Sequence, residues 1–240
     1  MTRGPDVIAL QGDAKRSFVA GLFDQIASHY DAANLLISLG QTTIWRLLAL
    51  RGLVLQPGDR VLDIGCGTGW VVRHLQRAYP GVEIEGMDLS AGMLGEARRR
   101  DPAGRYFLGD VRSIPRPDRS YELVTTAFTL RNFPDLGEAL YEMLRVLKPG
   151  GRLLVLEAFR PAEAPAWFRA MHELWLRRVI PLLARPFGGP EPYRYLSESI
   201  LRYMSVAELV QRLKALGAAV EEVRSFSMGA AALIVARPVM

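Results

Sequence analysis

A chain of 240 residues, of which 50% are hydrophobic and 23% charged, can bury one substantial core without the help of disulfides or metal ions. Its single cysteine excludes an internal disulfide, its first 20 residues lack the layout of a signal peptide, and no apolar run reaches the roughly 18 residues of a membrane span. The net charge of +5 comes from dispersed basic residues, which disfavours a nucleic-acid partner.

Apolar residues three and four apart predict an amphipathic helix over residues 17–30 and a second helix over residues 42–53. Strand and helix patterns then alternate. Strands are predicted at residues 60–64, 82–87, 106–108, 121–128 and 152–159, and helices at 70–78, 91–100 and 136–147. Because the connections are short, this alternation predicts right-handed crossovers and a parallel sheet covered by helices on both faces.

The C-terminal part departs from this alternation. Residues 160–203 form a long segment rich in Trp, Arg, Leu and Pro, and a helix is predicted at 206–216. Two final strands, at 220–226 and 230–236, are separated by only three residues, which is hairpin spacing. We therefore expect an α/β fold with a seven-stranded, mostly parallel sheet that ends in an antiparallel hairpin.

The pattern divides the chain into four expected parts around this one sheet. They are an N-terminal helical cap (1–55), a Rossmann-like core (56–159), a helical lid or insertion (160–204), and a C-terminal helix with the hairpin that completes the sheet (205–240). Open α/β sheets bind ligands at the carboxyl ends of their strands, so we expect the Rossmann-like core to bind a cofactor.

The strongest signal is a glycine-rich turn between the first predicted strand and the next helix, with the sequence Asp-Ile-Gly-Cys-Gly-Thr-Gly at 63–69. Glycines let a ligand approach the backbone closely, beside amides that have no helical partner. A dinucleotide-binding turn needs a glycine where Trp70 stands, whereas this spacing suits the amino-acid end of S-adenosylmethionine. The alternative is that the glycines only allow tight packing of strand and helix. The candidate cofactor residues here are Asp63, Gly65, Gly67, Thr68 and Gly69.

Two further acids follow the second and third predicted strands. Asp88, with Leu89 after it, can accept hydrogen bonds from both ribose hydroxyls of such a cofactor. Asp110 can accept from the adenine amino group, and the Val111 amide can donate to the ring. Each acid alone is equally explained as a solvated strand end or a helix cap. Three such features at consecutive strand ends predict a cofactor site at one edge of the sheet.

Other cofactors find less support in the sequence. His29, His74 and His172 have no metal-ligand spacing, so we expect no metal site. Cys66 lies between two glycines with no His or Asp beside it, and we interpret it as a small side chain in a tight turn. A nicotinamide oxidoreductase is disfavoured because the chain has no Tyr-x-x-x-Lys pair.

Four further motifs point to a narrower group. They are Phe23 with Tyr30, Asp31 and Asn34, the run Phe-Thr-Leu-Arg-Asn at 128–132, the run Val-Leu-Lys-Pro-Gly-Gly-Arg-Leu at 146–153, and Tyr-Arg-Tyr-Leu-Ser-Glu-Ser-Ile at 193–200. Together they resemble the ubiquinone/menaquinone biosynthesis C-methyltransferase family, over nearly the whole chain from about residue 17. The Lys-Pro-Gly-Gly turn is shared with many methyltransferases, whereas the Leu-Arg-Asn run and the motif at 193–200 are far more specific.

The resemblance implies a class I methyltransferase fold, S-adenosylmethionine as cofactor, and methylation of a ring carbon on a polyprenyl quinol, with demethylmenaquinol the commoner bacterial acceptor. It places cofactor contacts at Thr68, Asp88, Asp110 and Val111. Ala127 stands where the family often has a serine, so a hydroxyl contact near the cofactor sulfonium is expected to be absent, and Cys66 replaces a frequent glycine. The alternatives are another phenolic or lipophilic acceptor, or a cofactor-binding regulator without catalysis.

Polar residues near the expected methyl donor are candidates to act on the acceptor. Arg131 and Asn132, just beyond the fourth strand, are placed to hold the acceptor oxygen, unless they only bind loop carbonyls. Removing a quinol proton raises electron density on the adjacent carbon, so a base or a group that stabilises the phenolate should help. Tyr30, Tyr193 and Tyr195 are candidates to line the pocket and bind the acceptor oxygen, although Tyr30 also completes an apolar helix stripe.

The segment 166–186 combines large apolar residues with arginines. This composition suits a lid that admits a greasy polyprenyl tail while it rests against a lipid surface. A homodimer interface or an extra core helix explains it equally well. We therefore expect a cytoplasmic enzyme, in which this segment either contacts the inner face of the cytoplasmic membrane or forms one of these two alternatives.

Overall fold

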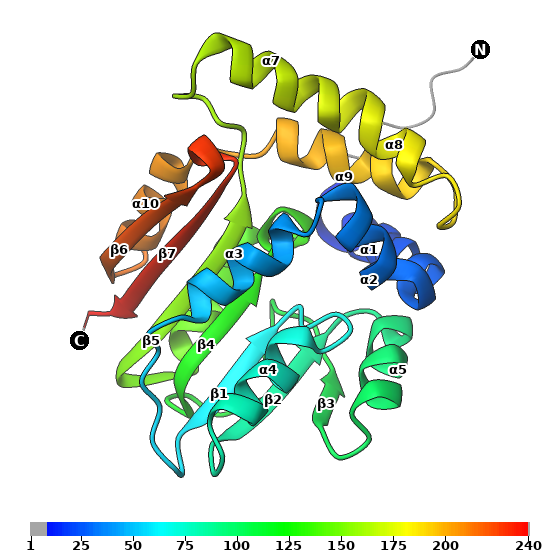
Figure 1. Cartoon of the computed structure of the whole chain (residues 1–240). Helices are drawn as coiled ribbons and strands as arrows, with labels where there is room; N and C mark the ends of the chain where they lie inside the picture. Colours follow the sequence, from blue (N-terminus) through cyan, green and yellow to red (C-terminus); the bar gives the residue numbers. More distant parts are fainter. Residues whose placement is uncertain (1–8, 240) are drawn as a thin grey trace.

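A seven-stranded sheet runs through the centre of the structure, a computed structural model that describes residues 9–239 (Figure 1). Its strands are β1 (Arg60–Ile64), β2 (Glu83–Asp88), β3 (Arg105–Leu108), β4 (Tyr121–Ala127), β5 (Leu147–Ala158), β6 (Ala218–Phe226) and β7 (Ala231–Pro238). They lie in the order β3-β2-β1-β4-β5-β7-β6. Strands β1 to β5 pair in parallel, and β7 is antiparallel to both β5 and β6. The expected α/β fold with a C-terminal antiparallel hairpin is therefore confirmed.

One predicted boundary in the sheet is wrong. The helix expected over 136–147 ends at Arg145, and β5 begins at Leu147, earlier than predicted. Leu147 is buried and pairs with Tyr121, after which the register shifts past residues 148–151. The Lys-Pro-Gly-Gly turn thus bulges out between two paired parts of one strand, because burial and pairing of Leu147 outweigh a further half-turn of helix.

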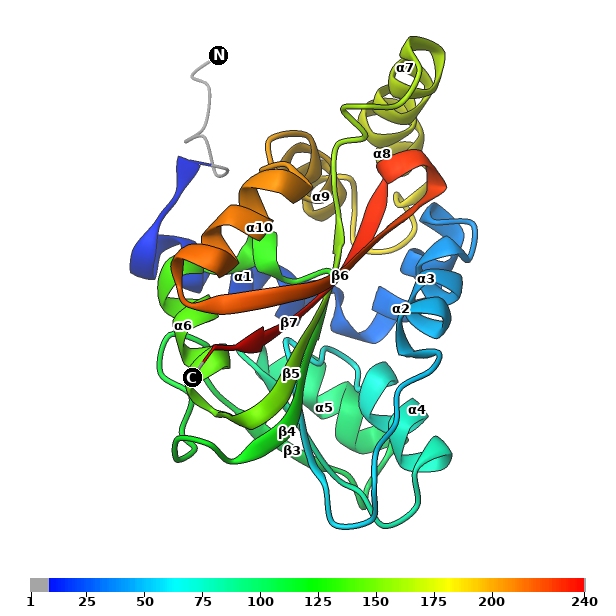
Figure 2. The same ribbon diagram turned by 90° about the vertical axis from the view of Figure 1, so that its left-hand side faces the viewer.

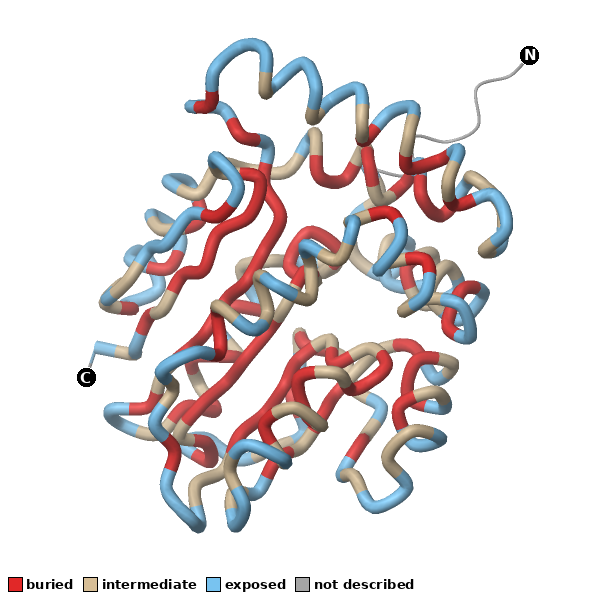
Figure 3. Tube along the Cα trace, viewed as in Figure 1, coloured by how far each residue is buried: buried red, intermediate tan, exposed pale blue. Residues whose placement is uncertain are grey.

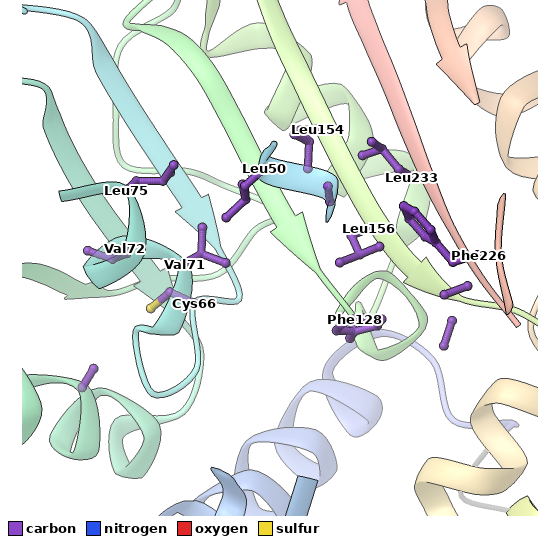
Figure 4. Packing of buried hydrophobic residues seen from close by; sticks show 14 of the residues in the cluster. Leu50, Cys66, Val71, Val72, Leu75, Phe128, Leu154, Leu156, Phe226 and Leu233 are labelled. Atoms are coloured by element: carbon purple, nitrogen blue, oxygen red, sulfur yellow. The ribbon is translucent and has the colours of Figure 1, made fainter. Parts of the chain in front are cut away.

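Helices cover the sheet on both faces (Figure 2). They are α4 (Trp70–Ala78), α5 (Ala91–Arg100), α6 (Leu136–Arg145) and α10 (Val206–Ala215), together with α3 (Gln41–Leu50). On one face, α3, α4 and α5 bury Leu50, Leu75 and Leu94 against the strands, and Figure 4 shows part of this cluster. On the other face, α6 and α10 pack on the sheet. The central strands are buried along most of their length (Figure 3), so a ligand can reach only their ends.

Two more helices precede α3 along the chain, α1 (Gly12–Ile26) and α2 (Tyr30–Ile37). The prediction of one helix over 17–30 is wrong at its end, because a 3-10 turn over Ala27–His29 separates α1 from α2. The apolar spacing continues through this turn, where Ala27 packs with Ile26 in a small buried cluster. As a result Tyr30 begins a new helix rather than ending the first one.

The segment between β5 and α10 forms a layer above the carboxyl ends of the parallel strands (Figure 1). It consists of α7 (Ala166–Leu174), a π-helical stretch (Trp175–Val179), α8 (Ile180–Leu183) and α9 (Glu191–Leu201). Across residues 9–239, every helix is too short or too polar to cross a membrane. Residues 1–8, which belong to the expected N-terminal cap and to the stretch searched for a signal peptide, lie outside the described residues.

Candidate active site

Predicted cofactor residues meet at the carboxyl ends of β1, β2 and β3, around a cavity of about 80 Å³. Those that line it are Gly65, Gly67, Asp88, Leu89, Asp110 and Val111. Phe23 of α1, Tyr30 of α2 and Phe128 after β4 complete the wall. The strand order brings these distant segments together, as expected for the carboxyl edge of an open α/β sheet.

Steric room distinguishes the glycines of the turn. Gly65 has a φ of 66°, and a Cβ there would lie 2.5 Å from Cγ2 of Thr129. Gly69 has a φ of 78°, and its Cβ would lie 2.5 Å from the hydroxyl oxygen of Tyr106. At Gly67, which lines the cavity, no atom lies within 4 Å of such a Cβ. Tight packing therefore accounts for Gly65 and Gly69, whereas Gly67 leaves space where a ligand can approach the backbone.

The carboxylate of Asp88 is held by backbone amides. Its Oδ2 accepts a hydrogen bond from the amide of Gly67 at 2.7 Å, and its Oδ1 accepts one from the amide of Ser90 at 2.9 Å. Burial raises the pKa of Asp88, although these amides oppose the rise. A carboxylate oxygen has two lone pairs, so both oxygens can accept a further hydrogen bond. Asp88 therefore fits a pair of ribose hydroxyls.

Side chains hold the carboxylate of Asp110. Arg112 donates to both of its oxygens, and Nε of Arg16 lies 2.9 Å from Oδ2. Burial alone would raise the pKa of Asp110, but the two arginines lower it. An adenine amino group would share this carboxylate with two guanidinium groups, so Asp110 has less free acceptor capacity than Asp88.

Some of the predicted cofactor residues do not line the cavity. They are Asp63, Thr68, Gly69 and Ala127. Asp63 accepts a hydrogen bond from the hydroxyl of Thr125 at 2.7 Å, and burial raises the pKa of Asp63 to about 7. The buried hydroxyl of Thr68 donates to Asp31 at 2.9 Å. These contacts tie the end of β1 and the glycine turn to β4 and α2.

A second and larger cavity, of about 350 Å³, adjoins the first. Its lining is mostly apolar and comes from α1 to α3, from the helices between residues 166 and 183, and from α9. All the predicted acceptor residues line it, namely Tyr30, Arg131, Asn132, Tyr193 and Tyr195. Phe23, Tyr30, Phe128 and Asn132 line both cavities, so the two share one wall.

A buried ion pair borders the larger cavity, and only its arginine was predicted from the sequence. The guanidinium of Arg131 donates to the carboxylate of Glu157 in β5, and the two side chains are 6% and 0% exposed. Within the described residues, Arg131 Nε, Asn132 Oδ1 and Glu157 Oε2 have no hydrogen-bond partner. The signal that could have revealed Glu157 is a lone acid in the apolar run Leu-Leu-Val-Leu-Glu-Ala at 153–158.

The phenols of the larger cavity are neutral at physiological pH. Burial raises the pKa of Tyr30, and it raises the pKa of Tyr193 and of Tyr195 to about 12. These side chains can therefore form hydrogen bonds but do not act as phenolate bases near pH 7. His172 also lines this cavity, and burial lowers its pKa, so its imidazole is neutral as well. His29, by contrast, is exposed and lines neither cavity.

The fold and the site together define a class of enzyme. A parallel sheet whose last strand, β7, inserts antiparallel between β5 and β6 is the plan of class I methyltransferases. The residues at its carboxyl edge fit S-adenosylmethionine, because Gly67 leaves room for a ligand and Asp88 keeps free acceptor capacity. The chain is thus a class I S-adenosylmethionine-dependent methyltransferase.

Comparison with known proteins identifies the family. A model described as the ubiE/COQ5 methyltransferase family matches residues 11–237, and the chain belongs to this family. It is 37% identical over 222 residues to the demethylmenaquinone methyltransferase of Renibacterium salmoninarum, covering 92% of each chain. A protein of the same name from Thermotoga maritima is 36% identical over 204 residues, covering 85% of this chain and 89% of the relative.

Solved structures agree on the fold. A S-adenosylmethionine-dependent methyltransferase from Thermotoga maritima matches with a TM-score of 0.66 at 20% identity, covering 92% of this chain and 100% of that chain. A second, from Aquifex aeolicus, matches with a TM-score of 0.57 at 19% identity, covering 81% and 89%. At this identity the likeness shows the fold alone, and the cofactor follows from the family.

Proposed function

We propose that this enzyme transfers a methyl group from S-adenosylmethionine to a ring carbon of demethylmenaquinol. The observation that carries the proposal is the larger cavity, a mostly apolar chamber that shares a wall with the cofactor cavity and has Arg131 and Asn132 in its lining. A greasy ring system suits such a chamber, and its hydroxyls need a few polar partners. The relatives named demethylmenaquinone methyltransferase support the same acceptor.

In this proposal, the side chains that line the two cavities have different roles in methyl transfer. Bound S-adenosylmethionine supplies an electrophilic methyl group, and the protein has to align the acceptor carbon with it and exclude water. Such alignment can be worth about 7 to 11 kcal/mol. Asn132 and Tyr30 lie in the shared wall, and in this proposal they hold the acceptor hydroxyl. Arg131 stabilises the oxygen as its proton leaves, because a cation favours the developing phenolate. Tyr193 and Tyr195 line the rest of the acceptor chamber.

Methyl transfer from labelled S-adenosylmethionine to chemically reduced demethylmenaquinone tests the proposal. We expect label on the ring carbon with the quinol and none with the oxidised quinone, because only the quinol can lose a hydroxyl proton and activate the carbon. If the enzyme binds the cofactor and methylates a different lipophilic phenol but not the quinol, the acceptor is wrong and the fold assignment is unaffected.

We also propose that the mouth of the larger cavity rests on an acidic membrane surface. Leu39 and Met171 line the cavity, yet they are 64% and 51% exposed. Trp167 and Leu174 are also exposed and share one face of α7 with Met171, at helical spacing. The exposed Arg178 and Arg185, which follow on the same segment, form no ion pair within the described residues. Apolar side chains with nearby cations suit an acidic lipid surface, where an acceptor with a polyprenyl tail would lie.

Co-sedimentation with vesicles that contain phosphatidylglycerol tests this contact. The double variant Met171→Asp/Leu174→Asp should lower the bound fraction several-fold, because each change puts a charge into the apolar patch. Val54→Asp is the matched control, since Val54 is 67% exposed in the loop before β1. This variant should bind vesicles like the unmodified chain. If the chain ignores vesicles and instead forms a dimer that the double variant disrupts, the surface is a homodimer interface.

A further inference from the structure

Arg46, in α3, is a partly buried cation without an acidic partner. Its guanidinium carbon lies 5.5 Å from the ring centroid of Trp70 and 5.4 Å from that of Phe128. Its Nε is buried and has no hydrogen-bond partner, and within residues 9–239 the group forms no hydrogen bond and no ion pair. Other shielded arginines, such as Arg131 and Arg145, are paired with acids. A buried guanidinium nitrogen without a hydrogen-bond partner is costly, and an anion that joins it would remove that cost.

Arg46 lines neither cavity, but its two aromatic neighbours lie beside the cofactor cavity. Trp70 directly follows the glycine turn, at the start of α4. Phe128 follows β4 in a left-handed conformation, with a φ of 64°, and lines both cavities. The guanidinium therefore lies between the turns that follow β1 and β4. The positive charge of Arg46 also opposes the rise in pKa that burial causes at Asp63 in β1 and at Tyr30 in α2.

The expected cofactor carries an anionic group that would suit this place. The glycine spacing of the turn is typical of a site for the amino-acid end of S-adenosylmethionine, which carries an α-carboxylate. Two acids of the chain would repel such a group, namely Asp63, one residue before the end of β1, and Asp88, which ends β2. Three other arginines around the turn already have partners. Arg73 donates to the carbonyl of Thr68, Arg98 donates to the carbonyl of Tyr106, and Arg100 pairs with Asp31.

We propose that Arg46 binds the α-carboxylate of S-adenosylmethionine. The guanidinium carbon lies over both aromatic rings, and within the described residues its N–H groups have no other partner, so they remain available to donate to a carboxylate. The rings thus orient the arginine without competing for its hydrogen bonds. The proposal assigns the cofactor's carboxylate to α3, an element outside the glycine turn and the strand ends.

Binding of two ligands that differ only in this carboxylate tests the proposal by isothermal titration calorimetry. S-adenosylmethionine has the group, and decarboxylated S-adenosylmethionine lacks it. Arg46→Gln should weaken the first ligand about 10- to 100-fold, the range for loss of a hydrogen bond to a charged group, and leave the second within about 2-fold. Arg46→Lys, which keeps the charge but loses the planar fork, should fall between the unmodified chain and Arg46→Gln.

Arg51→Gln is the control, because Arg51 is an exposed residue at the end of the same helix, and it should change neither affinity. The melting temperature of each variant shows whether the fold is intact. An equal loss of affinity for both ligands would mean that Arg46 only organises the aromatic contacts, and unchanged affinity for both would mean that it binds no carboxylate. Either result overturns the proposal, and neither depends on which acceptor the enzyme methylates.

Discussion

Replacing Arg131 with leucine should destabilise the fold by about 3 to 5 kcal/mol, the range measured when one partner of a buried ion pair is removed. The change leaves the carboxylate of Glu157, which is 0% exposed, without its countercharge. Urea unfolding at pH 7 measures the effect. Arg237→Leu is the control, because its pair with Glu221 is largely exposed and should contribute no more than about 1 kcal/mol.

The double variant Arg131→Leu/Glu157→Leu separates stability from chemistry. It removes both charges, and replacing a buried ion pair with apolar side chains is often neutral or stabilising, so we expect most of the lost stability to return. Methyl transfer should stay at least 100-fold below that of the unmodified chain, because the cation beside the acceptor oxygen is still missing. Recovery of both stability and turnover in the double variant would limit this pair to a structural role.

Asp88→Ala should weaken S-adenosylmethionine binding by a factor of 100 or more. The change removes the carboxylate that we expect to accept from two ribose hydroxyls, and a hydrogen bond to a charged group contributes about 1.5 to 3 kcal/mol. It also removes the contact that Gly67 N makes with Oδ2, so the glycine turn loses support. Calorimetric titration gives the affinity, and a melting curve shows whether the fold persists.

Asp110→Ala provides the comparison at the next strand end. Its carboxylate is already shared with Arg112 and Arg16, so we expect a loss of no more than about 10-fold. Equal losses in the two variants would contradict the different roles that their hydrogen bonds suggest.

The affinity of the unmodified chain for S-adenosylmethionine should also depend on pH, because only ionised Asp88 is expected to accept from both ribose hydroxyls. The affinity should be highest above the pKa of Asp88 and should fall as the pH drops through that pKa. Because burial raises the pKa of Asp88, the affinity should begin to fall at a higher pH than it would with an exposed carboxylate.

The core of the fold was predictable because its signals are local. Strand β1 and helices α4 and α5 have the bounds that the sequence predicted, since apolar runs and turn residues mark them. Asp88 and Asp110 could be placed in one site because parallel strands end at the same edge of a sheet. The helices between residues 166 and 201 were harder to predict from the sequence, because they line a cavity and carry apolar residues on more than one side.

Features that depend on long-range contacts could not be predicted. Glu157 lies 26 positions after Arg131, and only the pairing of β4 with β5 brings them together. The hydroxyl of Thr68 donates to Asp31 of α2, a carboxylate that no local spacing places there, and the predicted cofactor contact of Thr68 stays a prediction. Arg46 could not be identified from local sequence, because neither of its aromatic neighbours is close to it in the chain.

The wall that the two cavities share has a thermodynamic consequence. Phe23, Tyr30, Phe128 and Asn132 face both chambers, so any shift of these side chains on binding one ligand changes the surface offered to the other. Thermodynamic linkage then requires equal effects in both directions. If bound cofactor changes the dissociation constant of the acceptor by some factor, bound acceptor changes the dissociation constant of the cofactor by the same factor. Because methyl transfer alters both ligands at once, the affinities of the two products are coupled through the same four side chains.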